Sequence, residues 1–97
     1  MTESGSAPGA FDVIFAPQAR RALSVKLPES VAAAALEFIL GPLCENPYRM
    51  GKPLKRELEG FYSARRGEYR VIYQVRADVL IIEIVGASHR LHAHRDR

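Results

Sequence analysis

The sequence predicts an α+β domain in which two helices pack on one face of a small sheet. Three observations support this fold class. A short apolar strand comes first, two helical segments follow it, and three strand-like segments joined by tight turns complete the pattern. The chain has 97 residues, 47% of them hydrophobic, which is enough for one core and too few for two. We interpret residues 1–10 as a disordered leader and residues 11–97 as one domain.

The first predicted elements are a strand and a short helix. Residues 11–15 read Phe-Asp-Val-Ile-Phe, an apolar segment that is typical of a strand. Pro17 suits the first position of a helix because its ring fixes φ and its missing N–H has no helical partner there. We therefore expect a helix over residues 18–26.

A second helix is predicted to begin at Pro28. Its apolar residues keep a 3.6-residue period from Val31 to Leu43, which indicates one buried face. Gly41-Pro42 should kink or end this helix, and Asn46-Pro47 should end any continuation.

Residues 47–60 are rich in proline and glycine and are predicted to be mostly loop. Two strands should follow, at residues 61–66 and 69–76, joined by a tight turn at Gly67-Glu68. The second of them alternates apolar and polar side chains, so one of its faces is buried.

A third strand is predicted over residues 79–85, after a turn at Ala77-Asp78. This run is almost continuously apolar, which favours a central strand with both faces covered. Gly86 should end the strand, and a basic tail follows it. Together the three strands form an antiparallel meander.

The net charge of +3 is unevenly distributed along the chain. Residues 1–48 have a net charge of −2, whereas residues 49–70 hold seven basic and three acidic groups and have a net charge of +4. Residues 89–97 have a net charge of +2 with neutral histidines. A basic central block and a basic tail indicate a polyanionic partner. A solvated basic face without a partner is the alternative.

Several function classes are disfavoured by the composition. No apolar stretch approaches the roughly 18 residues of a membrane span, and the N-terminus lacks the features of a secretory signal. Cys44 is the only cysteine, so an internal disulfide is impossible; these features favour the cytoplasm. Neither Ser63 nor Ser88 lies in a glycine-rich nucleophile elbow, and no nucleotide-binding glycine loop occurs. Carboxylates are sparse in the basic block, which argues against a magnesium-dependent nuclease, and we predict no cofactor.

Basic side chains at alternating strand positions are the strongest functional pattern. Arg65 and Arg70 flank the predicted turn at Gly67-Glu68, and Arg90 begins the tail. Neighbouring strands lie about 4.8 Å apart, so the three guanidinium groups can converge if the strand register agrees. Such a group would bind phosphate through bidentate hydrogen bonds.

Tyr62, Tyr69 and Tyr73 alternate with these cations. Their rings suit either stacking on unpaired bases or core packing. Core packing is favoured for Tyr69 and Tyr73, whereas for Tyr62 the two readings are balanced.

His89, His92 and His94 lie close together in the tail. A metal site is disfavoured because Arg90 and Arg95 would repel a dication. A histidine beside a phosphate suits proton transfer, and a disordered basic tail is the alternative.

The segment from residue 46 onward resembles the RelE/ParE toxin superfamily. The resemblance covers roughly residues 11–95 and is strongest in two combined segments, G-K-P-L and Y-R-x-x-Y. The matching positions are Asn46-Pro47, Gly51-Lys52-Pro53-Leu54, Leu58-x-Gly60, Arg65, Tyr69-Arg70 with Tyr73, and His89-Arg90.

The resemblance implies the toxin of a type II toxin–antitoxin pair and, within the RelE branch, a ribosome-dependent mRNA endonuclease. The implied partners are a RelB-like antitoxin that is acidic or partly disordered, the ribosome and mRNA, with no membrane. The family's functional arginines correspond to Arg70 and Arg90, and the arginine before the glycine turn corresponds to Arg65. The basic loop of the family corresponds to Lys52, Lys55 and Arg56.

From these positions we predict a metal-independent cleavage in which the RNA 2′-hydroxyl attacks the adjacent phosphorus. Arg70 and Arg90 would clamp the phosphate with support from Arg65, Lys52 or Lys55 would act as the base, and His94 as the acid. These roles can be exchanged among the same residues. The predicted RNA-binding residues are Arg56, Tyr62, Arg66 and His89.

The chain departs from the family at two places. Ser63 and Ala64 stand where relatives often have lysine or arginine, and His94 stands where many have tyrosine. Imidazole transfers protons at neutral pH, so the second change is compatible with catalysis. A gyrase-inhibiting toxin of the ParE branch and a non-catalytic nucleic-acid-binding module are the alternative functions.

Overall fold

A computed structural model of the chain describes residues 10–89. The predicted leader lies almost wholly outside this range, as do Arg90, His92 and His94 of the tail. Among residues 10–89, no helix is both long and apolar enough to cross a membrane. The elements are β1 (Asp12–Phe15), α1 (Pro17–Arg21), α2 (Glu29–Phe38), α3 (Pro47–Met50), β2 (Lys52–Pro53), β3 (Phe61–Arg66), β4 (Tyr69–Arg76) and β5 (Ile81–His89), with a 3₁₀ turn over Arg56–Leu58.

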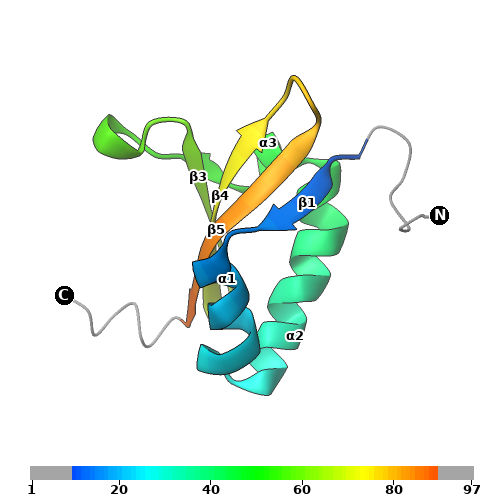
Figure 1. Ribbon diagram of the computed structural model, residues 1–97, viewed down its shortest axis with the longest axis vertical. Coiled ribbons are helices and arrows are strands. Elements are labelled where there is room, and N and C mark those ends of the chain that lie inside the picture. The colour runs from blue at the N-terminus through cyan, green and yellow to red at the C-terminus, as the bar shows by residue number, and fades with distance from the viewer. Residues whose placement is uncertain (1–9, 90–97) are drawn as a thin grey trace.

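The strands form one five-stranded sheet in the order β1-β5-β4-β3-β2 (Figure 1). β3, β4 and β5 are successive antiparallel neighbours, which confirms the predicted meander. The N-terminal strand β1 pairs in parallel with β5, so the first and last strands of the domain are adjacent. β5 therefore has a neighbouring strand on each side, which confirms the predicted central position. The helices, however, cover only one of its faces, and only Ile82 and Ile84 of the strand are buried.

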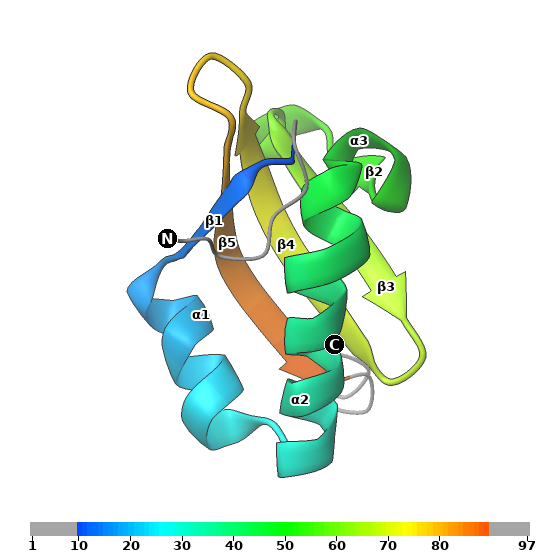
Figure 2. The same cartoon turned by 90° about the vertical axis from the view of Figure 1, so that its right-hand side faces the viewer.

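Both long helices lie on the same face of the sheet, in agreement with the predicted α+β architecture (Figure 2). α1 continues as a π-helical segment over Ala22–Lys26, so the predicted helix over residues 18–26 is present. We call the covered side the helix face. Its most deeply buried strand residues, all at most 1% exposed, are Ala64, Val71, Tyr73, Ile82 and Ile84. They pack with the apolar face of the second helix to form the core.

The second helix passes through Gly41-Pro42 instead of ending there. It continues from α2 as a π-helical segment over Ile39–Leu43, and the chain leaves the helix before Pro47. Proline lacks the N–H that an α-helix needs, and the wider π turn accommodates the missing hydrogen bond. Because Ile39 and Leu43 are fully buried, core packing favours continuing the helix past the proline.

Residues 47–60 contain more regular structure than the predicted loop. Pro47 begins the one-turn helix α3, and Lys52–Pro53 adds a two-residue edge strand to β3. A strand of two residues is too short to show a hydrophobic period, so β2 could not be predicted from the sequence pattern. Beyond β2, the segment around Arg56 extends away from the body of the protein (Figure 1).

β5 begins two residues later than predicted and does not end at Gly86. It runs from Ile81 to His89 with a β-bulge: Tyr73 pairs with Ile84 while Ile72 pairs with Gly86, so Val85 is an extra residue. The bulge shifts the alternation of side chains by one position. As a result Ala87 and His89 lie on the helix face, and Ser88 lies on the opposite side of the sheet.

Candidate functional site

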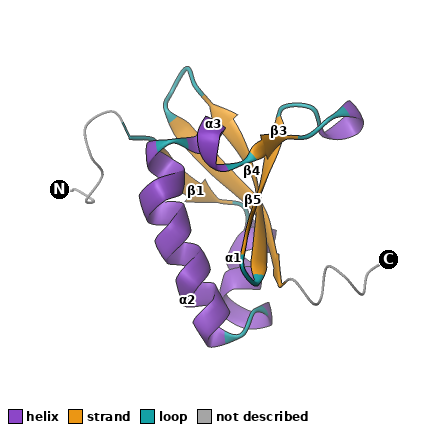
Figure 3. Cartoon of the chain, turned by 180° about the vertical axis from the view of Figure 1, so that it is seen from behind, coloured by secondary structure: helices purple, strands orange, loops and turns teal. Residues whose placement is uncertain are grey.

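We call the side of the sheet opposite the helices the open face (Figure 3). Two of the three predicted phosphate-binding arginines, Arg65 and Arg70, lie on it. Arg65 in β3 and Arg70 in β4 are direct cross-strand partners, so their side chains leave the same face next to each other. Arg65 is exposed and Arg70 is half-buried. Ser88 of β5 is the partner of Arg70 on its other side, which adds a hydroxyl group to the row.

Lys52 brings a third cation to this part of the sheet. It pairs with Ser63, two residues before Arg65 on β3, and is exposed. We call Lys52, Arg65 and Arg70 the basic corner. None of the three has a carboxylate partner within 4 Å among residues 10–89, where the arginine ion pair is Arg76–Glu83 and the other close contact is that of His89 with Glu68. The basic corner therefore leaves three cationic groups available to an anion.

Lys55 and Arg56 lie farther from the two arginines than Lys52 does. The amide of Leu54 donates to the carbonyl of Phe61, so the chain after β2 runs beyond the start of β3. Phe61 is four residues from Arg65, or about 13 Å at the rise of a strand. Arg56 also adopts a left-handed conformation with φ of 63°, which is strained for a residue with a side chain.

Three of the predicted RNA-binding residues lie on the helix face. Tyr62 stacks on Tyr73, with ring centroids 5.6 Å apart and planes inclined by 16°. Arg66 places its guanidinium 4.7 Å from the centre of the Phe38 ring and donates to the Met50 sulfur at 3.2 Å. His89 lies with Nε2 3.8 Å from a carboxylate oxygen of Glu68.

The position of these three residues follows from strand alternation. Arg66 neighbours Arg65 in sequence, and for that reason points to the other face. His89 is on the helix face because of the bulge in β5, which shifts the alternation after Val85. The structure thus separates Tyr62, Arg66 and His89 from the basic corner. Arg90 and His94 lie outside the described residues.

The β-bulge has its own support from the first helix. Gln18 Nε2 donates to the carbonyl oxygen of Val85, the extra residue, at 2.6 Å. The backbone amide of Ala16 donates to the carbonyl of the preceding residue, Ile84, at 2.9 Å. A bulge leaves backbone groups without ladder partners, and the Gln18 amide satisfies one of them. The role of Gln18 could not be predicted from the local sequence, because its partner is 67 residues away.

We expect Gln18→Glu to lower the free energy of unfolding by about 1 kcal/mol, because the replaced atom can no longer donate to the Val85 carbonyl. Denaturant unfolding of both proteins at neutral pH measures this difference. Gln18→Met is the control, because it removes the donor without adding a charge, and it should lose a similar amount of stability. A Gln18→Met protein as stable as the wild type would show that the Gln18 hydrogen bond does not stabilise the bulge.

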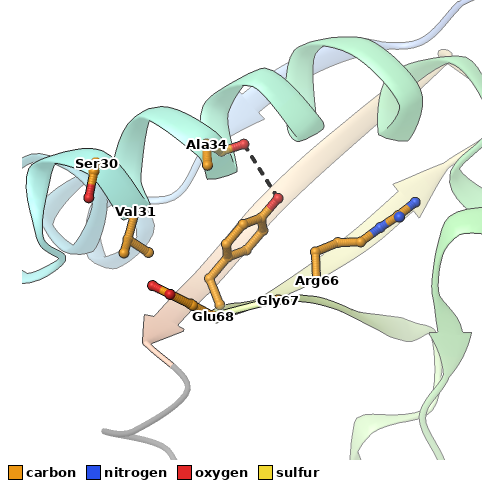
Figure 4. Close-up of a pocket in the computed structure, with 7 residues that line it drawn as sticks. Ser30, Val31, Ala34, Arg66, Gly67 and Glu68 are labelled. Carbon is orange, nitrogen blue, oxygen red and sulfur yellow. Dashed lines mark hydrogen bonds between the residues drawn. The ribbon is translucent and has the colours of Figure 1, made fainter.

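A cavity of about 300 Å³ lies on the helix face, between α2 and the turn that joins β3 to β4 (Figure 4). Its walls are Val31 and Ala34 of α2 and the ring of Tyr69, whose hydroxyl donates weakly to the Ala34 carbonyl at 3.4 Å. Burial raises the pKa of Tyr69, so its hydroxyl is neutral at physiological pH. The cavity is separated from the basic corner by the thickness of the sheet.

Cys44 is not a suitable nucleophile. Its thiol is 3% exposed and lies 3.1 Å from the Leu40 carbonyl oxygen. Burial is the main cause that raises the pKa of this thiol, which disfavours the reactive thiolate. The basic corner is therefore the arrangement of described residues best suited to chemistry on an anionic substrate.

Comparison with known proteins gives consistent matches. A family model described as the ParE toxin of the type II toxin–antitoxin system parDE matches residues 13–93. Toxin RelE of Mycobacterium tuberculosis is 48% identical over 77 residues, covering 74% of this chain and 79% of that protein. Toxin RelG of the same organism is 44% identical over 85 residues, covering 88% of this chain and 97% of that protein.

The fold has a solved counterpart in the crystal structure of the toxin–antitoxin complex RelBE2 from Mycobacterium tuberculosis. The match has a TM-score of 0.80 and 44% sequence identity, and it covers 84% of this chain and 99% of the matched chain. The similarity thus extends over most of the chain.

Proposed function

Because the chain belongs to the ParE/RelE family of toxins from type II toxin–antitoxin systems, we propose that it is a ribosome-dependent mRNA endonuclease that stops translation and growth. The observation that carries this proposal is the basic corner, in which Arg65 and Arg70 are paired on the open face beside Lys52. A phosphodiester is the ligand that such a group of cations suits best.

In the proposed reaction the 2′-hydroxyl oxygen attacks the adjacent phosphorus in line, and the bond from phosphorus to the 5′-oxygen breaks. A base takes the 2′-hydroxyl proton and an acid gives a proton to the leaving 5′-oxygen. The products are a 2′,3′-cyclic phosphate and a 5′-hydroxyl. Negative charge accumulates on the non-bridging oxygens of the transition state, and cations already in position stabilise it.

The proposed roles of the described residues are supported by their places in the sheet. Arg70, half-buried at the centre of the row, is the main contact to the non-bridging oxygens, with Arg65 beside it. Lys52 is favoured over Lys55 as the base because its pairing with Ser63 places it near Arg65. Arg90 as the second clamp residue and His94 as the acid keep the roles that the family resemblance implies.

The dependence on the ribosome has a physical reason. The basic corner offers charge but few groups that would read a base, and a chain of 97 residues has little surface for binding a long RNA. A ribosome that holds the mRNA in the reactive geometry would supply the orientation that the toxin lacks. This activity also implies that the protein acts in the cytoplasm.

We further propose that a cognate antitoxin covers the basic corner. The RelBE2 structure, which this chain resembles, is a complex of a toxin with its antitoxin. An acidic, partly disordered antitoxin segment that folds on binding would neutralise Lys52, Arg65 and Arg70. Covering these residues would block the approach of RNA phosphate.

We expect the purified protein to cut mRNA in a translation extract, with primer extension showing new 5′ ends inside the reading frame. The same mRNA without ribosomes should remain intact. Cleavage of free RNA at the same rate would contradict the ribosome dependence. The absence of cleavage in both conditions would contradict the proposed activity.

The second candidate function is inhibition of gyrase, and the name of the matching family model favours it. A DNA supercoiling assay with the same preparation separates the two candidates. Inhibition of supercoiling together with intact mRNA would assign the chain to the gyrase-inhibiting toxins.

A further inference from the structure

We propose that the close contact between Gly51 and Tyr73, which we call the seat, positions Lys52 beside Arg65 and Arg70. Gly51 and Tyr73 are thus positioning residues for the cleavage reaction. This inference rests on the proposed function for its role in catalysis. Neither Gly51 nor Tyr73 belongs to the basic corner. The Tyr73 side chain lies on the helix face, and from there it contacts the chain segment that carries Lys52.

Tyr73 is the fixed part of the seat. Its side chain is fully buried in β4, its ring stacks on Tyr62, and its hydroxyl donates to the Pro47 carbonyl at 2.6 Å. Burial raises the pKa of Tyr73 to about 12, so the hydroxyl keeps its proton at physiological pH and the hydrogen bond persists. Through this bond the central strand holds the first residue of α3.

Gly51 lies directly on the Tyr73 hydroxyl. A Cβ atom at Gly51 would overlap with that oxygen, and it would be 3.0 Å from the Ser63 carbonyl oxygen and 3.1 Å from Cζ of Tyr73. The backbone at Gly51 has φ of −127°, which any residue adopts. Glycine is therefore needed here for close approach to Tyr73 and not for its conformational freedom.

The seat decides where Lys52 lies because Lys52 follows Gly51 directly. Its strand, β2, has only two residues, which pair with Ser63 and Tyr62. So short an edge strand contributes few hydrogen bonds of its own. In addition, the positive charge of Lys52 is repelled by Arg65 and Arg70. Contacts of Gly51 and Pro47 with the buried Tyr73 offset that repulsion and keep the lysine in the row.

The test compares variants that change the contact between Gly51 and Tyr73 with a control variant at another glycine. Gly51→Ala should slow cleavage on ribosomes by about 10- to 100-fold, the usual effect of a displaced reactive group. Tyr73→Phe removes the oxygen that the new methyl group meets, but it also removes the hydrogen bond to Pro47. Gly51→Ala/Tyr73→Phe should therefore cleave faster than Gly51→Ala, and no faster than Tyr73→Phe alone. Gly41→Ala is the matched control, because a Cβ at Gly41 meets no atom within 4 Å.

A positioning role also predicts that Gly51→Ala acts on the rate through Lys52. In a Lys52→Ala background, Gly51→Ala should lower Tm as it does in the wild type but should not slow cleavage further. If the two rate losses multiply, Gly51 does not act through Lys52 and the proposal is wrong.

Hydrogen exchange tests the seat without any cleavage assay. The Leu54 amide, which donates to Phe61 at 2.8 Å just after β2, should exchange faster in Gly51→Ala than in the wild type. In Gly51→Ala/Tyr73→Phe it should exchange more slowly than in Gly51→Ala, at a rate close to that of Tyr73→Phe alone. This pattern in a protein that cuts no mRNA would overturn the proposed function and leave the seat intact. Unchanged Leu54 exchange in a protein that does cut mRNA would overturn the seat.

Discussion

Arg70→Ala is expected to lower the cleavage rate on programmed ribosomes by about 10²–10³-fold and to remove toxicity on expression. Arg70 is the member of the basic corner with neighbours on both sides, Arg65 and Ser88, and its half-buried position fixes the guanidinium on the open face. Removing Arg70 takes away the positive charge at the centre of this row, and no other described cation lies at that position. Single-turnover cleavage measures the rate, and circular dichroism confirms the fold.

Two controls separate catalysis from general binding of nucleic acid. Arg21→Ala removes an exposed arginine from the end of α1 and should leave cleavage unchanged. Arg70→Lys keeps the charge but loses the planar bidentate geometry, so an endonuclease should be impaired by it while a charge-dependent binder should tolerate it. Growth arrest by folded Arg70→Ala equal to that of the wild type would refute the assignment of Arg70.

His94→Ala is expected to slow cleavage by about 10²–10⁴-fold, the usual contribution of a positioned acid or base. His94 follows Arg90 by four residues and stands where relatives often have tyrosine. Imidazole transfers protons at neutral pH, which suits His94 to the role of acid. His94→Tyr should keep part of the activity, since a phenol can donate the same proton.

The competing interpretation is that the tail takes no part in the reaction. It predicts that deleting residues 94–97 leaves the single-turnover rate within about threefold of the wild type, since no acid or base would be lost. A truncated protein that is as fast as the full chain would therefore reject His94 as the acid.

The parts of the fold that depend on local pattern were predictable. The β3–β4 hairpin has the predicted bounds because alternation on both sides of Gly67-Glu68 fixes its register. The same register places Arg65 opposite Arg70, which is the part of the site that the sequence anticipated. Lys52 was among the candidates, but only the pairing with Ser63 distinguishes it from Lys55.

The parts that depend on long-range contacts were not predictable. Gly86 reads as a strand end, whereas the bulge before it and the Gln18 hydrogen bond let β5 continue to His89. That one extra residue also decides that His89 faces the helices. Likewise, Gly51 reads as an ordinary loop glycine until Tyr73, 22 positions later in the numbering, is known to lie beneath it.

The most direct test of the proposed activity is the chemistry of the ends left on mRNA after cleavage on purified ribosomes. Transesterification by the 2′-hydroxyl predicts a 2′,3′-cyclic phosphate on the upstream fragment and a 5′-hydroxyl on the downstream fragment, both identifiable by mass spectrometry. A 3′-hydroxyl with a 5′-phosphate would show that water attacked the phosphorus, and would contradict the account.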